Sequence, residues 1–267
     1  MMFQVFDATV GGERFGFPAF WNGYAYMRSR SNARQIADAT AEDAAAYAEA
    51  IYAGSPLKVV SPQWTKSSPS ADPKALAILD FEGETNRDAV LQYLQNFRAA
   101  APNLRVGYYP TWFYSKTPLD INRDWVIGAT TPSLKSQFTA LTRALDAAKE
   151  YTRPVMKYLD CLLPDCYLLG ETCFQRDLNY LVSVRKLLSS YDKAIYPFIW
   201  GIWHPGPNDS WNPAVMVDGV NRYPRPTEKQ FDQLIKVLRD NFEGCVVWGD
   251  RDQNEELIAA LKRAGVV

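Results

Sequence analysis

Short apolar runs alternate with longer, more polar segments along this chain, and the two kinds of segment have different periods. The apolar runs have the length of buried strands, whereas the longer segments repeat their apolar residues at helical spacing. The expected strands lie at residues 15–21, 57–62, 75–84, 104–109, within 155–170, at 194–200 and at 245–249. The expected helices lie at residues 39–53, 86–100, 133–151, 174–190, 227–241 and 254–263.

Strands that alternate with helices predict parallel pairing with right-handed crossovers. Seven such units predict an α/β fold, a single (β/α) barrel of the TIM type with seven strands. The whole chain, residues 1–267, is expected to form one domain. Residues 1–12 are expected to form a short hairpin or a first strand, and residues 201–226 a long loop.

Two acidic residues follow the buried apolar run in residues 75–84, ALAILDFEGE. Side chains alternate along a strand, which places Asp80 and Glu82 on one face, about 6.6 Å apart along the backbone. Ligands bind at the carboxyl ends of strands in parallel α/β folds. Like charges this close disfavour double ionisation, so one carboxyl is expected to keep its proton, as a general acid must. The alternative is a helix-capping acid or a surface ion pair.

The composition excludes several classes of function. A formal net charge of -1 gives no basic surface for nucleic acid or an acidic membrane. No segment approaches the roughly eighteen uninterrupted apolar residues of a membrane-spanning helix. His204 is the only histidine and the four cysteines match no zinc spacing, so no histidine-based triad, metal site or cofactor is expected. Eight tryptophans and fifteen tyrosines supply rings that stack on sugars or fill a core.

Four motifs follow one another between residues 76 and 249. They are Asp80-Phe81-Glu82, the LPDCY segment at 163–167, the run from Arg176-Asp177-Leu178 through AIYP at 194–197, and VVWG at 246–249. Together they resemble the hyaluronidases of glycoside hydrolase family 56, a family with a seven-stranded (β/α) barrel. The resemblance covers most of the chain, and it implies a secreted or cell-envelope enzyme acting on a poly- or oligosaccharide.

The resemblance also implies roles for particular residues. Glu82 falls on the proton donor, and Asp80 on the aspartate that orients the substrate's acetamido group. The acetamido oxygen itself attacks the anomeric carbon, so retention needs no protein nucleophile. Trp248 falls on a tryptophan that lines the cleft. The resemblance further implies a disulfide between Cys166 and Cys173 in an exported protein.

Three substitutions depart from the family pattern. Cys161 stands where the family has a tyrosine that supports the acetamido group, while Phe198 and Trp200 replace a serine and a tyrosine. These departures leave open a carbohydrate-binding relative without turnover. A further alternative pairs Glu82 with Glu171 as the two carboxylates of an ordinary glycosidase. Glu171 is otherwise an acidic residue in the first turn of a helix.

Several other residues are candidates for contact with sugar. Tyr109 and Trp112 follow the fourth strand and could form a platform, and only one of Tyr108 and Tyr109 can face the site by alternation. Tyr196 and Trp200 are cleft candidates, and His204 is interpreted as structural. Asp250 and Asp252 follow the last strand, where they bind sugar hydroxyls or cap the final helix. The predicted function is an endo-acting glycoside hydrolase that cleaves a polysaccharide containing N-acetylhexosamine.

Overall fold

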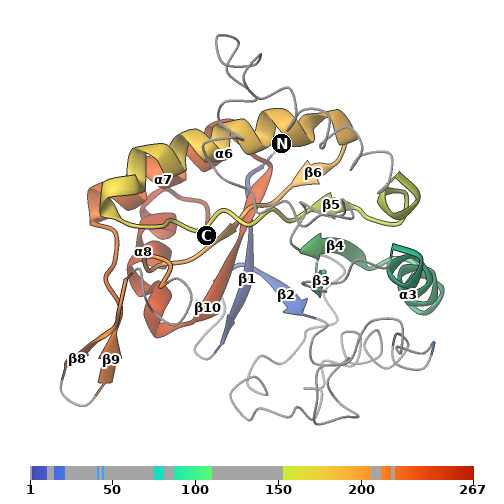
Figure 1. Ribbon diagram of the computed structural model, residues 1–267, viewed down its shortest axis with the longest axis horizontal. Helices are drawn as coiled ribbons and strands as arrows, with labels where there is room; N and C mark the ends of the chain where they lie inside the picture. Colours follow the sequence, from blue (N-terminus) through green and yellow to red (C-terminus); the bar gives the residue numbers. More distant parts are fainter. Residues whose placement is uncertain are drawn as a thin grey trace.

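The structure, a computed structural model, describes residues 2–10, 15–21, 41, 44, 75–80, 87–109, 153–205, 212–217 and 220–267. An eight-stranded sheet forms its centre, and all its neighbouring strands run parallel (Figure 1). The strands, in sheet order, are β6 (Ala194–Ile195), β5 (Cys161–Leu162), β4 (Arg105–Tyr109), β3 (Leu76–Asp80), β2 (Phe17–Trp21), β1 (Gln4–Val10), β10 (Gly244–Asp250) and β7 (Phe198–Ile199). The chain therefore has an α/β fold with a parallel sheet.

The pairing register brings the ends of the strands to common edges. Gln4 pairs with Gly244 at the start of β1 and β10, and Val10 pairs with Asp250 at their ends. Asp80 and Tyr109, the last residues of β3 and β4, also pair. Residues that close these strands therefore gather at the carboxyl edge of the sheet.

The predicted sixth strand is divided in two, and its halves pair with opposite ends of the strand order. β6 pairs with β5, and β7 pairs with β10, with only Tyr196 and Pro197 between them. Proline has no N–H to donate, which interrupts the ladder. The flanking backbone stays bonded on both sides: Tyr196 N donates to Leu162 O at 2.9 Å, and Val246 N donates to Pro197 O at 3.0 Å.

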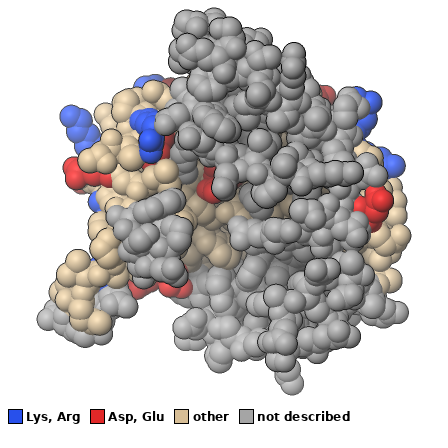
Figure 2. Space-filling view, in the orientation of Figure 1, with Lys and Arg blue, Asp and Glu red and all other residues tan. Residues whose placement is uncertain are grey.

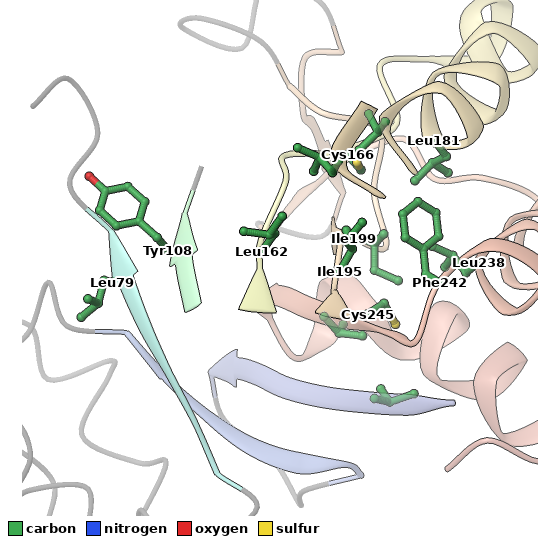
Figure 3. Close-up of a cluster of buried hydrophobic side chains, with 14 of the residues drawn as sticks. Leu79, Tyr108, Leu162, Cys166, Leu181, Ile195, Ile199, Leu238, Phe242 and Cys245 are labelled. Atoms are coloured by element: carbon green, nitrogen blue, oxygen red, sulfur yellow. The ribbon is translucent and has the colours of Figure 1, made fainter. Parts of the chain in front are cut away.

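Helices pack against one face of these strands. They are α3 (Arg87–Ala100), α6 (Phe174–Leu188), α7 (Glu228–Asn241) and α8 (Glu255–Arg263). Short 3₁₀ turns flank two of them: η4 (Glu171–Cys173) precedes α6, η5 (Ser189–Tyr191) follows α6, and η7 (Asp252–Asn254) precedes α8. The stripe predicted for residues 174–190, namely Leu178, Leu181, Val184 and Leu188, is buried. Ile199 of the sheet belongs to the same buried cluster as Leu181 of α6 and Phe242, which follows α7 (Figure 3). None of the helices among the described residues is long and apolar enough to cross a membrane.

The helix signals at the carboxyl-terminal end of the chain are confirmed. Thr227 and Gln230 form the predicted capping box, in which Gln230 N donates to Thr227 Oγ1 and Thr227 N donates to Gln230 Oε1. α7 ends at Asn241, and α8 ends at Arg263, as the apolar periodicity predicts.

The structure decides some predictions that the sequence left open. Of the two alternatives for residues 1–12, the strand is found: β1 lies inside the sheet between β2 and β10. β2 pairs directly with β3. The strand predicted at residues 57–62 and the helix predicted at residues 133–151 lie outside the described residues. The fifth strand, predicted within residues 155–170, is Cys161–Leu162.

The predicted long loop contains a two-stranded antiparallel ribbon, β8 (Val215–Val217) and β9 (Val220–Arg222), which projects from the body (Figure 1). The Asp-Gly pair between two apolar runs was a usable signal for it.

Candidate functional site

Alternation along the strands divides the buried residues into two clusters. The outer cluster packs against the helices and includes Leu79 and Tyr108. The inner cluster lies on the opposite face of the strands and includes Ile78 and Tyr109. The expectation that Tyr108 and Tyr109 face opposite sides is therefore confirmed.

Six rings form a connected group at the carboxyl edge, which we call the carboxyl-edge cluster. Its members are Tyr109, Tyr167, Phe198, Trp200, His204 and Trp248. The Tyr109 and Tyr167 hydroxyls lie 3.3 Å apart. The Tyr167 ring stacks on His204 at 5.3 Å and meets Trp200 edge-on at 5.8 Å. These residues come from β4, β7, β10 and the segments that follow β5 and β7, so the parallel sheet is what assembles them.

Only part of this cluster is accessible to a ligand. Phe198 is 2% exposed, and Tyr109 and Tyr167 are each 7% exposed. Trp200, His204 and Trp248 are half-buried. The predicted Tyr109 platform is therefore mostly covered, and the tryptophans supply the ring surface that a sugar could reach.

The position of Trp200 is fixed by the turn that follows β10. Its Nε1 donates to Gln253 Oε1 at 3.0 Å. The indole also lies over Gly249, where a Cβ would come within 2.4 Å of the Trp200 Nε1 and where φ is +98°. Only glycine readily accepts that backbone conformation, and only its lack of a side chain permits this approach.

Asn254 joins the ends of β7 and β10 beneath this surface. It is fully buried, and its Nδ2 donates to the carbonyls of Trp248 and Asp250 at 2.9 and 2.8 Å. Its Oδ1 accepts from Gly201 N at 2.8 Å. One amide side chain therefore satisfies three backbone groups that belong to two separate strand ends.

Asp250, an acidic residue at this edge, has a raised pKa. Its side chain belongs to an exposed residue that ends β10. Partial burial, and secondly the charge of Asp252, raise the pKa of Asp250 above its usual 3.8. The carboxyl is therefore easier to protonate than an isolated aspartate.

We expect the substitution Asp252→Asn to lower the pKa of Asp250, because it removes a neighbouring negative charge. Since the folded protein holds the Asp250 proton more tightly than the unfolded chain, the stability that this group contributes is complete at low pH. It is lost as pH rises from 3.8 through the folded pKa. Carboxyl-carbon NMR titration measures the shift. Asp240→Asn on the exposed side of α7 is the control, and an unchanged Asp250 midpoint in Asp252→Asn would contradict the assignment.

Of the predicted acid pair, Asp80 and Glu82, the structure describes only the backbone of Asp80. Asp80 is the last residue of β3 and pairs with Tyr109, which places its backbone at the carboxyl edge. The Asp80 side chain, Glu82 and Trp112 lie outside the described residues. Glu171 is exposed and begins the 3₁₀ turn η4.

Tyr196 does not point to the carboxyl edge, where a cleft residue was expected. It is 3% exposed, and its hydroxyl donates to Gln4 Oε1 at 2.8 Å, at the amino end of β1. Its ring packs on Phe6 at 4.8 Å. Tyr196 is therefore a buried residue of the inner cluster that points toward the amino edge, and this corrects its interpretation as a cleft residue.

The cysteines also differ from the family pattern. Cys166 and Cys173 are free thiols, so the disulfide implied by the resemblance is absent; the Cys173 Sγ accepts a hydrogen bond from Arg176 at 3.1 Å. Cys161 is buried and donates to Val106 O at 3.9 Å. Burial raises the pKa of the Cys161 thiol, which stays neutral and turned to the backbone.

The sequence alone predicted no role for three residues of this edge. Tyr167 was visible only as part of the LPDCY segment, and nothing local marked Gln253 or Asn254 as supports for the last strand. Their partners lie about 50 residues away or across a turn, so spacing alone could not find them.

Charged residues of both signs are mixed on one face of the molecule. On the face drawn in Figure 2, acidic and basic side chains of the described residues both occur, and neither forms a single patch. This distribution agrees with the formal net charge of -1.

Comparisons with known proteins give structural likeness without sequence similarity. No family model matches the chain, and no curated protein matches it. Its structure is similar to that of bee venom hyaluronidase in complex with a hyaluronic acid tetramer, at 12% identity and a TM-score of 0.48, over 72% of this chain and 70% of the enzyme. The likeness is to a glycosidase.

A second glycosidase is also similar in structure. It is a double mutant of the Cellulomonas fimi endo-β-1,4-mannanase, at 10% identity and a TM-score of 0.44, over 98% of this chain and 70% of that enzyme. Both structural likenesses are at low sequence identity.

Proposed function

We propose that this chain is a glycoside hydrolase that cleaves a polysaccharide containing N-acetylhexosamine. The observation that carries the proposal is that Asp80, the first residue of the Asp80-Phe81-Glu82 motif, ends β3 and pairs with Tyr109 of the carboxyl-edge cluster. Glu82 is the acid and base, and Asp80 orients the acetamido group. Trp248 and Trp200 bind the faces of the sugar rings, and Asp250 binds a hydroxyl.

The reaction proceeds with retention and with assistance from the substrate. Glu82 donates its proton to the glycosidic oxygen as the bond to the anomeric carbon breaks. The acetamido oxygen attacks that carbon to form a cyclic intermediate, and Glu82 then deprotonates the water that opens it. Asp80 stabilises the positive charge on the acetamido nitrogen. This mechanism needs one carboxylate pair on one strand and no nucleophile across the cleft.

We infer that the parallel sheet closes into a seven-stranded barrel. The pairing of β6 with β5 and of β7 with β10 supports closure, because the two halves are one short segment of chain. β6 and β7 then count as one strand, which gives seven. In a closed barrel the inner cluster fills the interior, and the carboxyl-edge cluster lies at its mouth.

A second candidate is a carbohydrate-binding protein without turnover. The observation that favours it is Cys161, whose buried thiol hydrogen-bonds Val106 O and leaves the acetamido group without the family's tyrosine. Such a protein would still bind sugar rings on Trp200 and Trp248, but it would not cleave the glycosidic bond.

The two candidates differ in turnover and in response to an inhibitor. Chitin oligosaccharides, hyaluronan and peptidoglycan fragments are incubated with the protein, and new reducing ends are measured. We expect release from an N-acetylated glycan and competitive inhibition by N-acetylglucosamine thiazoline, which mimics the cyclic intermediate. Binding without release favours the second candidate. Turnover that the thiazoline does not affect would rule out substrate assistance.

A further inference from the structure

Arg105 occupies the amino edge of the sheet, opposite the candidate active site. It is the first residue of β4 and is half-buried. Its Nη1 donates to Gln4 Oε1 at 2.8 Å and, at 3.5 Å, to the Tyr196 hydroxyl. The guanidinium carbon lies 5.5 Å from the centre of the Phe6 ring. These contacts hold one edge of the guanidinium in a fixed orientation.

The two acidic residues that act on the neighbouring Tyr196 are engaged by other groups. Asp160 pairs with Arg98 at 2.5 Å and also accepts a backbone N–H of β4 at 2.8 Å. Glu243 pairs with Arg185 at 2.7 Å and accepts a backbone N–H of β6 at 3.0 Å. Arg105 forms no ion pair with any residue that the structure describes, although a half-buried charge is costly without a counter-charge.

The other ionisable groups near Arg105 are neutral. Burial raises the pKa of Tyr196 to about 12, so its hydroxyl remains a donor to Gln4. Burial likewise raises the pKa of the Cys161 thiol. Neither group can supply the negative charge that Arg105 lacks.

The surroundings of Arg105 carry an excess of positive charge. Arg98 and Lys193 act on Cys161 together with Arg105, and Arg185 holds Glu243. Asp160 and Glu243 are each paired with an arginine, which leaves Arg105 and Lys193 without an ion pair among the described residues. An anion that approaches this edge meets an attractive field.

We propose that Arg105 is the centre of a second binding site, at the amino edge, for a small oxyanion. The Nε and Nη2 atoms make no hydrogen bond with any described residue, and this pair of N–H groups matches two oxygens of a carboxylate or a phosphate. Gln4 and Tyr196 hold the opposite side, which orients the free edge before the anion binds. The site is independent of the proposed hydrolase reaction, which occurs at the other end of the strands.

The test is a thermal-unfolding series with sodium acetate and sodium phosphate, with sodium chloride at equal ionic strength as the baseline. A ligand that binds only the folded protein raises the midpoint in a saturable way. We expect such a rise with at least one of the two oxyanions in the full-length protein. Acetate alone identifies a carboxylate site, and phosphate alone identifies a phosphate site. Equal effects of all three salts would overturn the proposal.

Variants then assign the effect to Arg105. Arg105→Gln should abolish the rise, and Arg105→Lys, which keeps the charge but not the planar pair of donors, should weaken the apparent affinity by about tenfold. Arg239→Gln, an arginine on α7 that donates to Ala264 O, is the matched control and should bind as the unmodified protein does. If Arg105→Gln does not fold, the apparent affinity of Arg105→Lys for the oxyanion tests the proposal alone. An unchanged affinity in Arg105→Lys overturns the proposal.

Discussion

Replacing Glu82 with glutamine is expected to lower turnover of an N-acetylated glycan by about 10²- to 10⁴-fold, the usual contribution of a general acid and base. The amide has nearly the shape of the carboxyl but cannot donate a proton to the leaving oxygen. Substrate binding should be retained, because Trp200 and Trp248 are unchanged. Initial rates of reducing-end release give the change in kcat, and calorimetric binding of an uncleaved oligosaccharide gives the affinity.

Glu171→Gln is the control that separates the two hydrolytic mechanisms. Glu171 is exposed in the turn η4 and has no role in substrate assistance, so its replacement should leave turnover within about twofold of the unmodified protein. A loss comparable to that of Glu82→Gln would instead support a two-carboxylate enzyme. If neither substitution alters the protein's effect on the glycan, the carbohydrate-binding reading replaces the enzyme.

Replacing Asn254 with alanine is expected to destabilise the fold by about 3 kcal/mol or more, since three buried backbone groups lose their partner. Those groups are the Gly201 N–H and the carbonyls of Trp248 and Asp250. For a chain of this length, the midpoint of thermal unfolding should fall by roughly 6–12 °C. Scanning calorimetry or circular dichroism measures the change.

Asn241→Ala is the matched control for this prediction. Asn241 is half-buried, and its side chain makes one hydrogen bond, from Nδ2 to Val237 O at 2.8 Å. Its loss should cost less than about 1 kcal/mol. Equal destabilisation by the two substitutions would show that Asn254 does not connect the strand ends in the way we describe.

Local signals were sufficient where one strong pattern determined an element. The apolar stripe of α6 and the capping box of α7 lie within a few consecutive residues, and both are found as predicted. The apolar run before Asp80 is likewise long enough to specify the buried strand β3. Burial and hydrogen bonding within one turn or one strand favour the same conformation in these segments, so the sequence suffices.

Local signals left the outcome open where pairing partners decided it. Residues 1–12 could be a hairpin or a first strand from the sequence alone, and pairing with β2 on one side and β10 on the other makes them the strand β1. The fifth strand has only two residues, and its position is set by Gly107 of β4 and Ala194 of β6. A segment this short has no periodicity to detect, because its stability comes from its neighbours.

The amino-acid sequence by itself determined the parallel α/β class, the strand that ends in Asp80, and the helices that cover the sheet, because burial period and capping are local properties. Only the tertiary structure decided which rings meet at the carboxyl edge, that Tyr196 points to the amino edge, and that Arg105 lacks an acidic partner among the described residues. These outcomes depend on register between strands that are distant in the chain. A shift in that register would change every contact and leave the local pattern the same.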